Sequence, residues 1–86
     1  MIYEVSFTKS ANKEVSKLPQ NVQVRVFKAI YSLVNNPRLG NVRLMVGSNS
    51  WRLRVGDYRI VYDIEDKLLK ILIIKIGPRK DVYRKR

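Results

Sequence analysis

Two side chains that serve much of enzyme chemistry are missing from this 86-residue sequence, which contains no cysteine and no histidine. Without cysteine, the chain can form no disulfide, no thiolate metal site and no thiol nucleophile. Without histidine, it lacks the commonest general base and the commonest ligand for transition metals. We therefore expect no metal and no cofactor, and any catalysis has to use other side chains.

Acidic residues are scarce as well, and long apolar runs are absent. The chain has 7 Asp and Glu against 18 Lys and Arg, which gives a net charge of +11. A charge of this size favours a polyanionic partner, such as RNA, DNA or an acidic protein, over a role in solubility alone. No apolar run approaches the roughly 20 residues of a membrane span, and the N-terminus has no signal-peptide pattern. We expect a cytoplasmic protein with no membrane partner.

The length of the chain predicts a single domain, residues 1–86. The first half of this domain has the pattern of one strand and two helices. Apolar and polar residues alternate over residues 1–7, which predicts a strand. Thr8 is a candidate N-cap for a short amphipathic helix that Pro19 ends. A second helix is expected from about residue 20 to residue 35, because its apolar residues recur at spacings of three and four.

The second half has the pattern of a loop followed by three strands. Residues 37–49 are rich in Gly, Asn and Ser and predict a loop. Residues 50–55 and 58–65 predict two strands joined by a tight turn at Gly56 and Asp57. Residues 68–76 are almost continuously apolar, which is typical of a central strand. The order β-α-α-β-β-β predicts an α+β fold, with a helical hairpin packed on one face of a small, mainly antiparallel sheet.

Three arginines lie on the two strands that flank the tight turn, within the segment W-R-L-R-V-G-D-Y-R-I-V-Y. Arg52 and Arg54 alternate with apolar residues, so their side chains are expected on the face opposite Trp51 and its apolar neighbours. Arg59 follows on the second strand. These arginines predict a polyanion site on the face of the sheet that the helices leave open, whereas Trp51 is expected in the core.

The order of elements, the segment above and the ending I-G-P-R-K-D-V-Y together resemble the RelE/ParE superfamily of bacterial and archaeal toxins, over essentially the whole chain. The RelE-like branch implies an mRNA interferase of a type II toxin–antitoxin system. Such a toxin is a ribosome-dependent endoribonuclease that cuts mRNA in the A site, inhibits translation and is held inactive by a cognate antitoxin. The ParE branch implies the same fold in a gyrase poison that cuts no RNA.

The resemblance also implies which residues form the site. Its catalytic basic residues and its C-terminal tyrosine match Arg52, Arg54, Arg59, Arg79 and Tyr83. Further candidates for RNA contacts are Arg43, Lys80 and Arg84. This chain has Pro78 where many relatives carry histidine, and residues 36–56 contain no acid where several relatives use a glutamate. The resemblance therefore implies catalysis by cations and a tyrosine.

Guanidinium groups suit one part of RNA cleavage in particular. When the ribose 2′-OH attacks the adjacent phosphate, charge builds on the phosphoryl oxygens, and fixed arginines can stabilise it. We expect Arg59 and Arg79 to clamp the scissile phosphate, and Arg52 and Arg54 to hold flanking phosphates or to aid proton transfer. Tyr83 is expected to orient the 2′-OH, stack on a base or serve as an acid or base.

The partners implied are the ribosome with its mRNA and an antitoxin with an acidic contact segment, in a hetero-oligomer. Three other functions stay open on the sequence alone. They are a gyrase poison, a nucleic-acid-binding module without catalysis, and a decayed toxin, the last because of Pro78.

Overall fold

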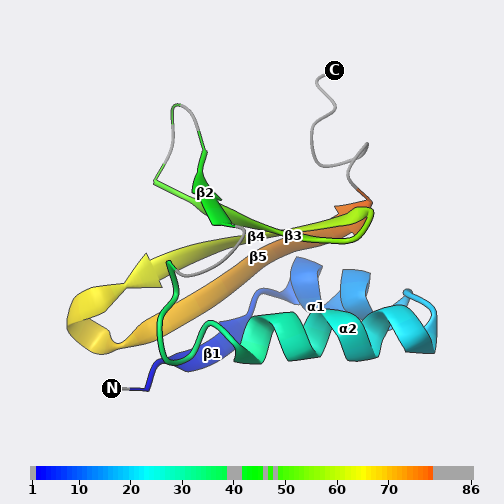
Figure 1. Ribbon diagram of the computed structural model, residues 1–86, viewed down its shortest axis with the longest axis horizontal. Coiled ribbons are helices and arrows are strands. Elements are labelled where there is room, and N and C mark those ends of the chain that lie inside the picture. The colour runs from blue at the N-terminus through cyan, green and yellow to red at the C-terminus, as the bar shows by residue number, and fades with distance from the viewer. Residues whose placement is uncertain (1, 39–41, 46, 48, 79–86) are drawn as a thin grey trace.

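Two helices cover one face of a five-stranded sheet in the computed structural model, which describes residues 2–38, 42–45, 47 and 49–78 (Figure 1). The strand order is β1-β5-β4-β3-β2; β1 pairs with β5 in parallel, and the other three pairs are antiparallel. The expected α+β fold is confirmed. The elements are β1 (Glu4–Phe7), α1 (Lys9–Ser16), α2 (Gln20–Tyr31), β2 (Val42–Leu44), β3 (Trp51–Val55), β4 (Tyr58–Glu65), a 3₁₀ turn (Asp66–Leu68) and β5 (Lys70–Pro78).

One strand was not expected from the sequence. Residues 37–49 were predicted to form a loop, but Val42–Leu44 is the edge strand β2, which pairs with β3. The ladder continues briefly, because the Met45 N–H donates to the Ser50 carbonyl at 2.8 Å. Three residues among Gly and Asn are too few to show a strand pattern, and β2 is held instead by the backbone groups at the edge of β3. The prediction of a plain loop was wrong here.

The helices begin where the sequence indicates. Thr8 caps α1, since its hydroxyl accepts a hydrogen bond from the Ala11 N–H at 3.1 Å, and the same hydroxyl donates to the Ile74 carbonyl of β5 at 3.1 Å. The second helix ends at Tyr31, four residues earlier than expected, and turns follow it. Leu33 lies in those turns and is nevertheless fully buried. Within the described part of the chain, neither helix has the length and apolar character needed to cross a bilayer.

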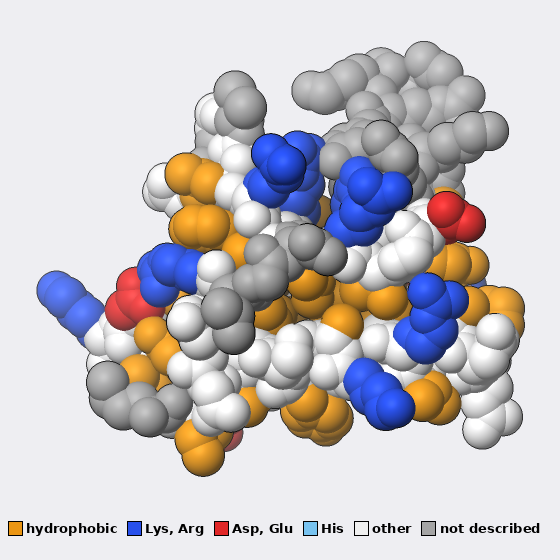
Figure 2. Space-filling model, viewed as in Figure 1, with side chains coloured by type: hydrophobic (Ala, Val, Ile, Leu, Met, Phe, Trp, Pro, Cys, Tyr) orange, Lys and Arg blue, Asp and Glu red, His pale blue; other side chains and the backbone are white. Residues whose placement is uncertain are grey.

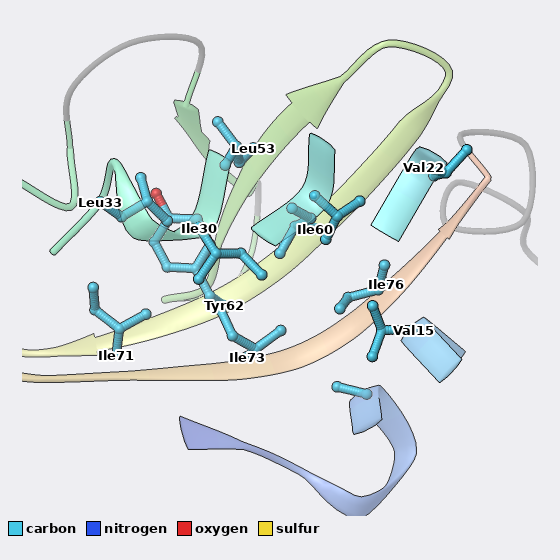
Figure 3. Close-up of a cluster of buried hydrophobic side chains, with 12 residues drawn as sticks. Val15, Val22, Ile30, Leu33, Leu53, Ile60, Tyr62, Ile71, Ile73 and Ile76 are labelled. Atoms are coloured by element: carbon cyan, nitrogen blue, oxygen red, sulfur yellow. The ribbon is translucent and has the colours of Figure 1, made fainter. Parts of the chain in front are cut away.

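The core lies between the helical layer and the inner face of the sheet (Figure 3). Tyr62 is its largest fully buried side chain, and Trp51 packs against the core while remaining partly exposed, as the alternation in β3 predicts. The buried core residues are Ala11, Val15, Val22, Val26, Ile30, Leu33, Leu53, Ile60, Tyr62, Ile71, Ile73 and Ile76.

A bulge in β5 changes which of its residues face the core. Val61 of β4 pairs with Lys75, whereas Tyr62 pairs with Ile73, so that Ile74 is an extra residue in the ladder. Ile73 and Ile76 therefore both face the core although they are three residues apart. Lys75 lies on the opposite side of the strand. An unbroken alternation counted from Ile73 would have placed Lys75 on the core side.

Candidate functional site

Four arginines from three adjacent strands lie on the face of the sheet that the helices leave open. Arg43 pairs with Arg52 across β2 and β3, and Arg54 pairs with Arg59 across β3 and β4. Directly opposite residues of antiparallel strands point to the same side. That side is opposite to Leu53 and Ile60 of the core. Figure 2 shows Lys and Arg side chains gathered on the side of the molecule above β3 and β4. We call Arg43, Arg52, Arg54 and Arg59 the arginine face.

The arginine face contains two like-charge pairs. Opposite side chains have Cβ atoms about 5 Å apart, and like charges at that distance destabilise a sheet. A bound polyanion would lower this repulsion further. The arrangement therefore has the electrostatics of an anion site.

Burial differs among these side chains. Arg59 is 5% exposed, Arg52 is half-buried, and Arg43 and Arg54 are exposed. The attraction between a guanidinium and an anion is stronger in the low dielectric around a buried group than at the surface. Arg59 is therefore the most enclosed cation of the arginine face, and the exposed Arg54 lies opposite it on β3.

The tight turn between β3 and β4 sets the pairing of Arg54 with Arg59. Val55 pairs with Tyr58, so Gly56 and Asp57 form a two-residue turn, as the sequence predicts. Gly56 has φ +59, at the first turn position, where hairpins favour glycine. A Cβ atom on Gly56 would lie 2.6 Å from Nη2 of Arg25, on α2.

Gly56→Ala should therefore destabilise the fold more than Gly47→Ala does. Both glycines have positive φ, 59 and 76 respectively, which costs about 1–2 kcal/mol for an L side chain. A Cβ at Gly47 meets nothing within 4 Å, whereas a Cβ at Gly56 also displaces the Arg25 guanidinium. Urea denaturation of the two variants measures the difference. Equal losses of unfolding free energy would show that the Arg25 contact does not matter.

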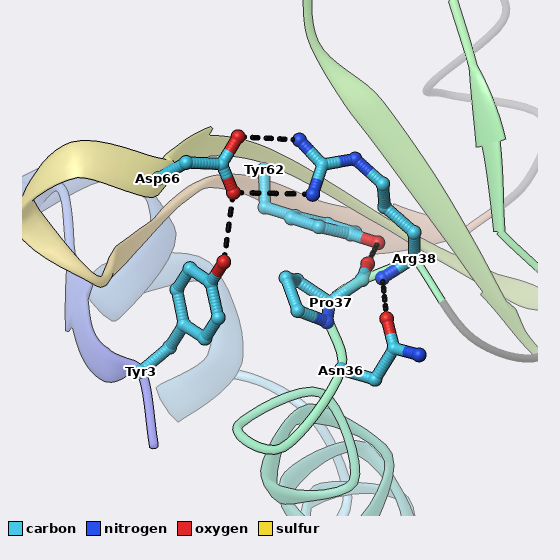
Figure 4. Close-up of polar contacts among 6 residues, drawn as sticks. All are labelled: Tyr3, Asn36, Pro37, Arg38, Tyr62 and Asp66. Carbon is cyan, nitrogen blue, oxygen red and sulfur yellow. Dashed lines mark hydrogen bonds and ion pairs between the residues drawn. The ribbon is translucent and has the colours of Figure 1, made fainter. Parts of the chain in front are cut away.

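A second polar cluster anchors the segment that leads from α2 to β2 (Figure 4). Arg38 donates to both carboxylate oxygens of Asp66, at 3.1 and 2.8 Å, and the Tyr3 hydroxyl donates to Asp66 Oδ1 at 2.7 Å. The Arg38 guanidinium also lies 5.5 Å from the centre of the Trp51 ring. Beside it, the buried Tyr62 hydroxyl donates to the Pro37 carbonyl at 2.6 Å. These contacts hold the chain just before β2, which carries Arg43.

The ionisation of these groups follows from their contacts. The Arg38 hydrogen bonds, followed by the Tyr3 hydrogen bond, hold the pKa of the Asp66 carboxyl below its usual value. The hydrogen bond to Asp66 raises the pKa of Tyr3. Burial raises the pKa of Tyr62 to about 12, although the nearby charge of Arg38 opposes this.

Sequence reasoning did not single out this cluster, because Arg38 and Asp66 are 28 residues apart and Tyr3 and Asp66 are 63 residues apart. It also missed Lys75. At the edge of β5, Lys75 Nζ donates to Glu14 Oε2 of α1 at 3.1 Å, and the Ile76 N–H donates to Glu14 Oε1 at 2.8 Å. Glu14 thus covers the part of the β5 edge that lies beyond the residues paired with β1.

The remaining sequence candidates fall outside the part of the chain that the structure describes. These are Arg79, Lys80, Tyr83 and Arg84. Pro78 is the last residue of β5 and pairs with Tyr58, one position beyond the pairing of Gly77 with Arg59. A proline has neither an ionisable side chain nor a backbone N–H. It therefore cannot replace the proton transfer that a histidine at this position could provide.

The sequence and the fold match a family of toxins. Residues 5–83 match the family model of the ParE toxin of type II toxin–antitoxin systems, parDE. The chain belongs to the RelE/ParE toxin superfamily.

Individual relatives are named RelG and RelE. Toxin RelG of Mycobacterium tuberculosis is 31% identical over 87 residues, which cover 99% of this chain and 100% of that protein. The mRNA interferase toxin RelE of Escherichia coli K12 is 30% identical over 87 residues, which cover 96% of this chain and 92% of that protein. A chain in the crystal structure of the toxin–antitoxin complex RelBE2 from M. tuberculosis superposes with a TM-score of 0.82 at 27% identity, covering 92% of this chain and 100% of that one.

Proposed function

We propose that this protein is a ribosome-dependent endoribonuclease, the toxin of a type II toxin–antitoxin pair, which cuts mRNA in the A site. The observation that supports this best is the arginine face, in which a buried Arg59 lies among three further arginines. The similarity to a relative named an mRNA interferase toxin agrees with it.

The arginine face suits the stabilisation of charge during transesterification. The ribose 2′-oxygen forms a bond to phosphorus, the bond from phosphorus to the 5′-oxygen breaks, and negative charge grows on the two non-bridging oxygens. Arg59 would hold those oxygens, together with Arg79, which the family resemblance assigns to the same task. Arg52 and Arg54 would hold neighbouring phosphates. Guanidiniums fixed on strands need little reorganisation as the charge develops, which is what makes such groups effective.

The side chains of this protein are less suited to proton transfer than to charge stabilisation. The chain has no histidine, and an arginine gives up its proton too reluctantly to act as a base. Tyr83 is the proposed acid or base, on the family resemblance. We infer that the ribosome supplies much of the rate by holding the message in a reactive geometry, since correct positioning can contribute several kcal/mol.

An antitoxin is the proposed partner away from the ribosome. The net charge of +11 favours an acidic contact segment on that partner, and the similarity to a chain of the RelBE2 complex favours a hetero-oligomer. A polyanion-like segment lying over the arginine face would exclude mRNA from it.

Inducing the protein in growing cells, with and without the antitoxin, tests the proposal. We expect growth arrest, with new mRNA 5′-ends at codons in the ribosomal A site. Purified protein should cut ribosome-bound mRNA in the presence of 1,10-phenanthroline, since the proposed reaction uses no transition metal. Intact mRNA together with double-strand DNA breaks would instead identify a gyrase poison. RNA that is bound but not cut would identify a binding module.

A further inference from the structure

The open face continues beyond the arginines to a carboxylate. Asp63 follows Arg59 by four residues and Val61 by two on β4, so all three side chains point to the open face. Asp63 is half-buried and pairs with Leu72 of β5. The Ser50 hydroxyl, immediately before β3, donates to Asp63 Oδ1 at 2.7 Å. A hydrogen bond from the neighbouring segment thus fixes the direction of this carboxylate.

Asp63 differs from the two carboxylates whose roles in the fold are clear. Glu14 binds Lys75 and the β5 backbone, and Asp66 binds Arg38. Within the described residues, Asp63 forms no ion pair, and the group that donates to it is a neutral hydroxyl. Its charge is therefore not used in holding the described part of the fold together.

Apolar side chains lie on both sides of Asp63. Val61 precedes it on the same face and is 7% exposed, while Leu72 lies opposite it and is 38% exposed. The exposed Leu72 provides a small apolar surface beside an acceptor, and the buried Val61 lies next to it. A nucleobase presents an apolar face and a polar edge, and single-stranded bases are commonly recognised through both.

The spacing along β4 suits one RNA strand. Residues that share a face are about 7 Å apart along a strand, so Asp63 lies about 14 Å from Arg59 along β4. A phosphate at Arg59 leaves room for the sugar and base of an adjacent nucleotide to extend over Val61 toward Asp63. At this distance from the phosphate, Asp63 cannot be the general base that removes the proton of the ribose 2′-OH. The distance instead places Asp63 where the edge of a nucleobase would lie.

A carboxylate selects among bases by accepting hydrogen bonds only. Guanine presents two neighbouring donors, N1–H and N2–H, on its Watson–Crick edge and can bind both carboxylate oxygens. Adenine and cytosine each present one amino group next to an acceptor, and uracil presents one N–H between two carbonyl groups. An acceptor placed against a carboxylate is repelled, so guanine should be favoured.

We propose that Asp63, oriented by Ser50, is a base-reading residue that favours guanine in a nucleotide adjacent to the cleaved bond. This inference rests on the proposed function. It adds a base preference to a face whose arginines are assigned to phosphates, and phosphate contacts carry no sequence information.

The test compares cleavage rates on ribosome-bound mRNAs that differ only in the A-site codon, across all four bases at each position. At one position the protein should cut guanine about tenfold or more faster than the other bases, as for a good bidentate base contact. Asp63→Asn, which replaces one acceptor with a donor, should reduce that ratio to about twofold. Ser50→Ala should reduce it partly. Glu65→Gln, on the same face and two residues further along β4, is the matched control and should leave the ratio unchanged.

The ratio of rates is internal to each variant, so it does not change if a variant is merely less stable or less active. Equal rates on all four bases at every position, or a guanine preference that survives Asp63→Asn, would overturn the base-reading role and leave the nuclease intact. If the unaltered protein cuts none of the mRNAs, the proposed function fails, and the base-reading role fails with it. Should Asp63→Asn not fold, an unchanged ratio in Ser50→Ala overturns the inference.

Discussion

Arg59→Ala should lower the rate of mRNA cleavage on the ribosome by about 100- to 1,000-fold, the loss typical of removing one fixed donor from a developing oxyanion. Arg59 is 5% exposed and pairs across the sheet with Arg54, so its guanidinium is the most enclosed cation of the arginine face. Arg59→Lys should recover only part of the rate, because an ammonium keeps the charge but loses the bidentate geometry. Single-turnover cleavage of a defined A-site codon measures the rates.

Two variants serve as controls for this result. Lys28→Ala removes one positive charge from an exposed position on α2, in the helical layer, and should leave the rate unchanged. Arg54→Ala removes an exposed cation of the arginine face and should cost less than Arg59→Ala. A rate for Arg59→Ala within about threefold of the unaltered protein, in a sample that still melts cooperatively, would remove Arg59 from the proposed site.

Tyr62→Phe should cost about 1–3 kcal/mol of unfolding free energy at pH 7, the usual effect of leaving a buried acceptor unsatisfied. The Tyr62 side chain is fully buried, and its hydroxyl donates to the Pro37 carbonyl at 2.6 Å. Phenylalanine fills the same space but leaves that carbonyl without its donor. Urea denaturation at pH 7 gives the difference.

The same variant should change how stability depends on pH. Burial raises the pKa of Tyr62 from 10.0 to about 12 in the folded state. A group whose pKa is higher when folded contributes stability that is fully present below its unfolded pKa and is lost as the pH rises through the folded pKa. The unaltered protein should therefore lose stability between about pH 10 and pH 12, and Tyr62→Phe should lose less. Their unfolding free energies should converge over that range.

Tyr31→Phe is the matched control, because Tyr31 is 64% exposed. It should follow the unaltered protein at every pH. Parallel pH profiles for Tyr62→Phe and the unaltered protein would show that the Tyr62 phenol does not titrate as burial requires.

Much of the fold could be predicted because it is encoded locally. The alternation in β3 and β4 placed Arg52 and Arg54 opposite the apolar residues, and Gly56 placed the turn that pairs Arg54 with Arg59. The strand β2 could not be predicted in this way, because its three residues are ordered by the edge of β3 rather than by a pattern of their own. Leu33 is fully buried, although the helix ends before it.

The candidate site could be predicted in part for the same reason. Arginines on neighbouring strands of one hairpin share a face by register alone, and this required only the period of two. Asp63 follows the same period on β4, so the signal for it was present in the sequence although it was not used. The anchoring of Arg38 by Asp66 and Tyr3 joins segments far apart in the chain, and no local pattern encodes such contacts.

The parallel pairing of β1 with β5 affects when the protein can fold during its own synthesis. Glu4 pairs with Lys70, and Phe7 pairs with Ile73. The first strand to be synthesised, β1, therefore has its neighbour in the sheet only after the last strand, β5, has been synthesised. Contacts so distant in sequence form slowly, because a long loop has to close first. The nascent chain therefore carries the arginines of β2, β3 and β4 in an unfinished sheet until β5 has been synthesised. The arginine face is complete only when synthesis of the protein is nearly finished.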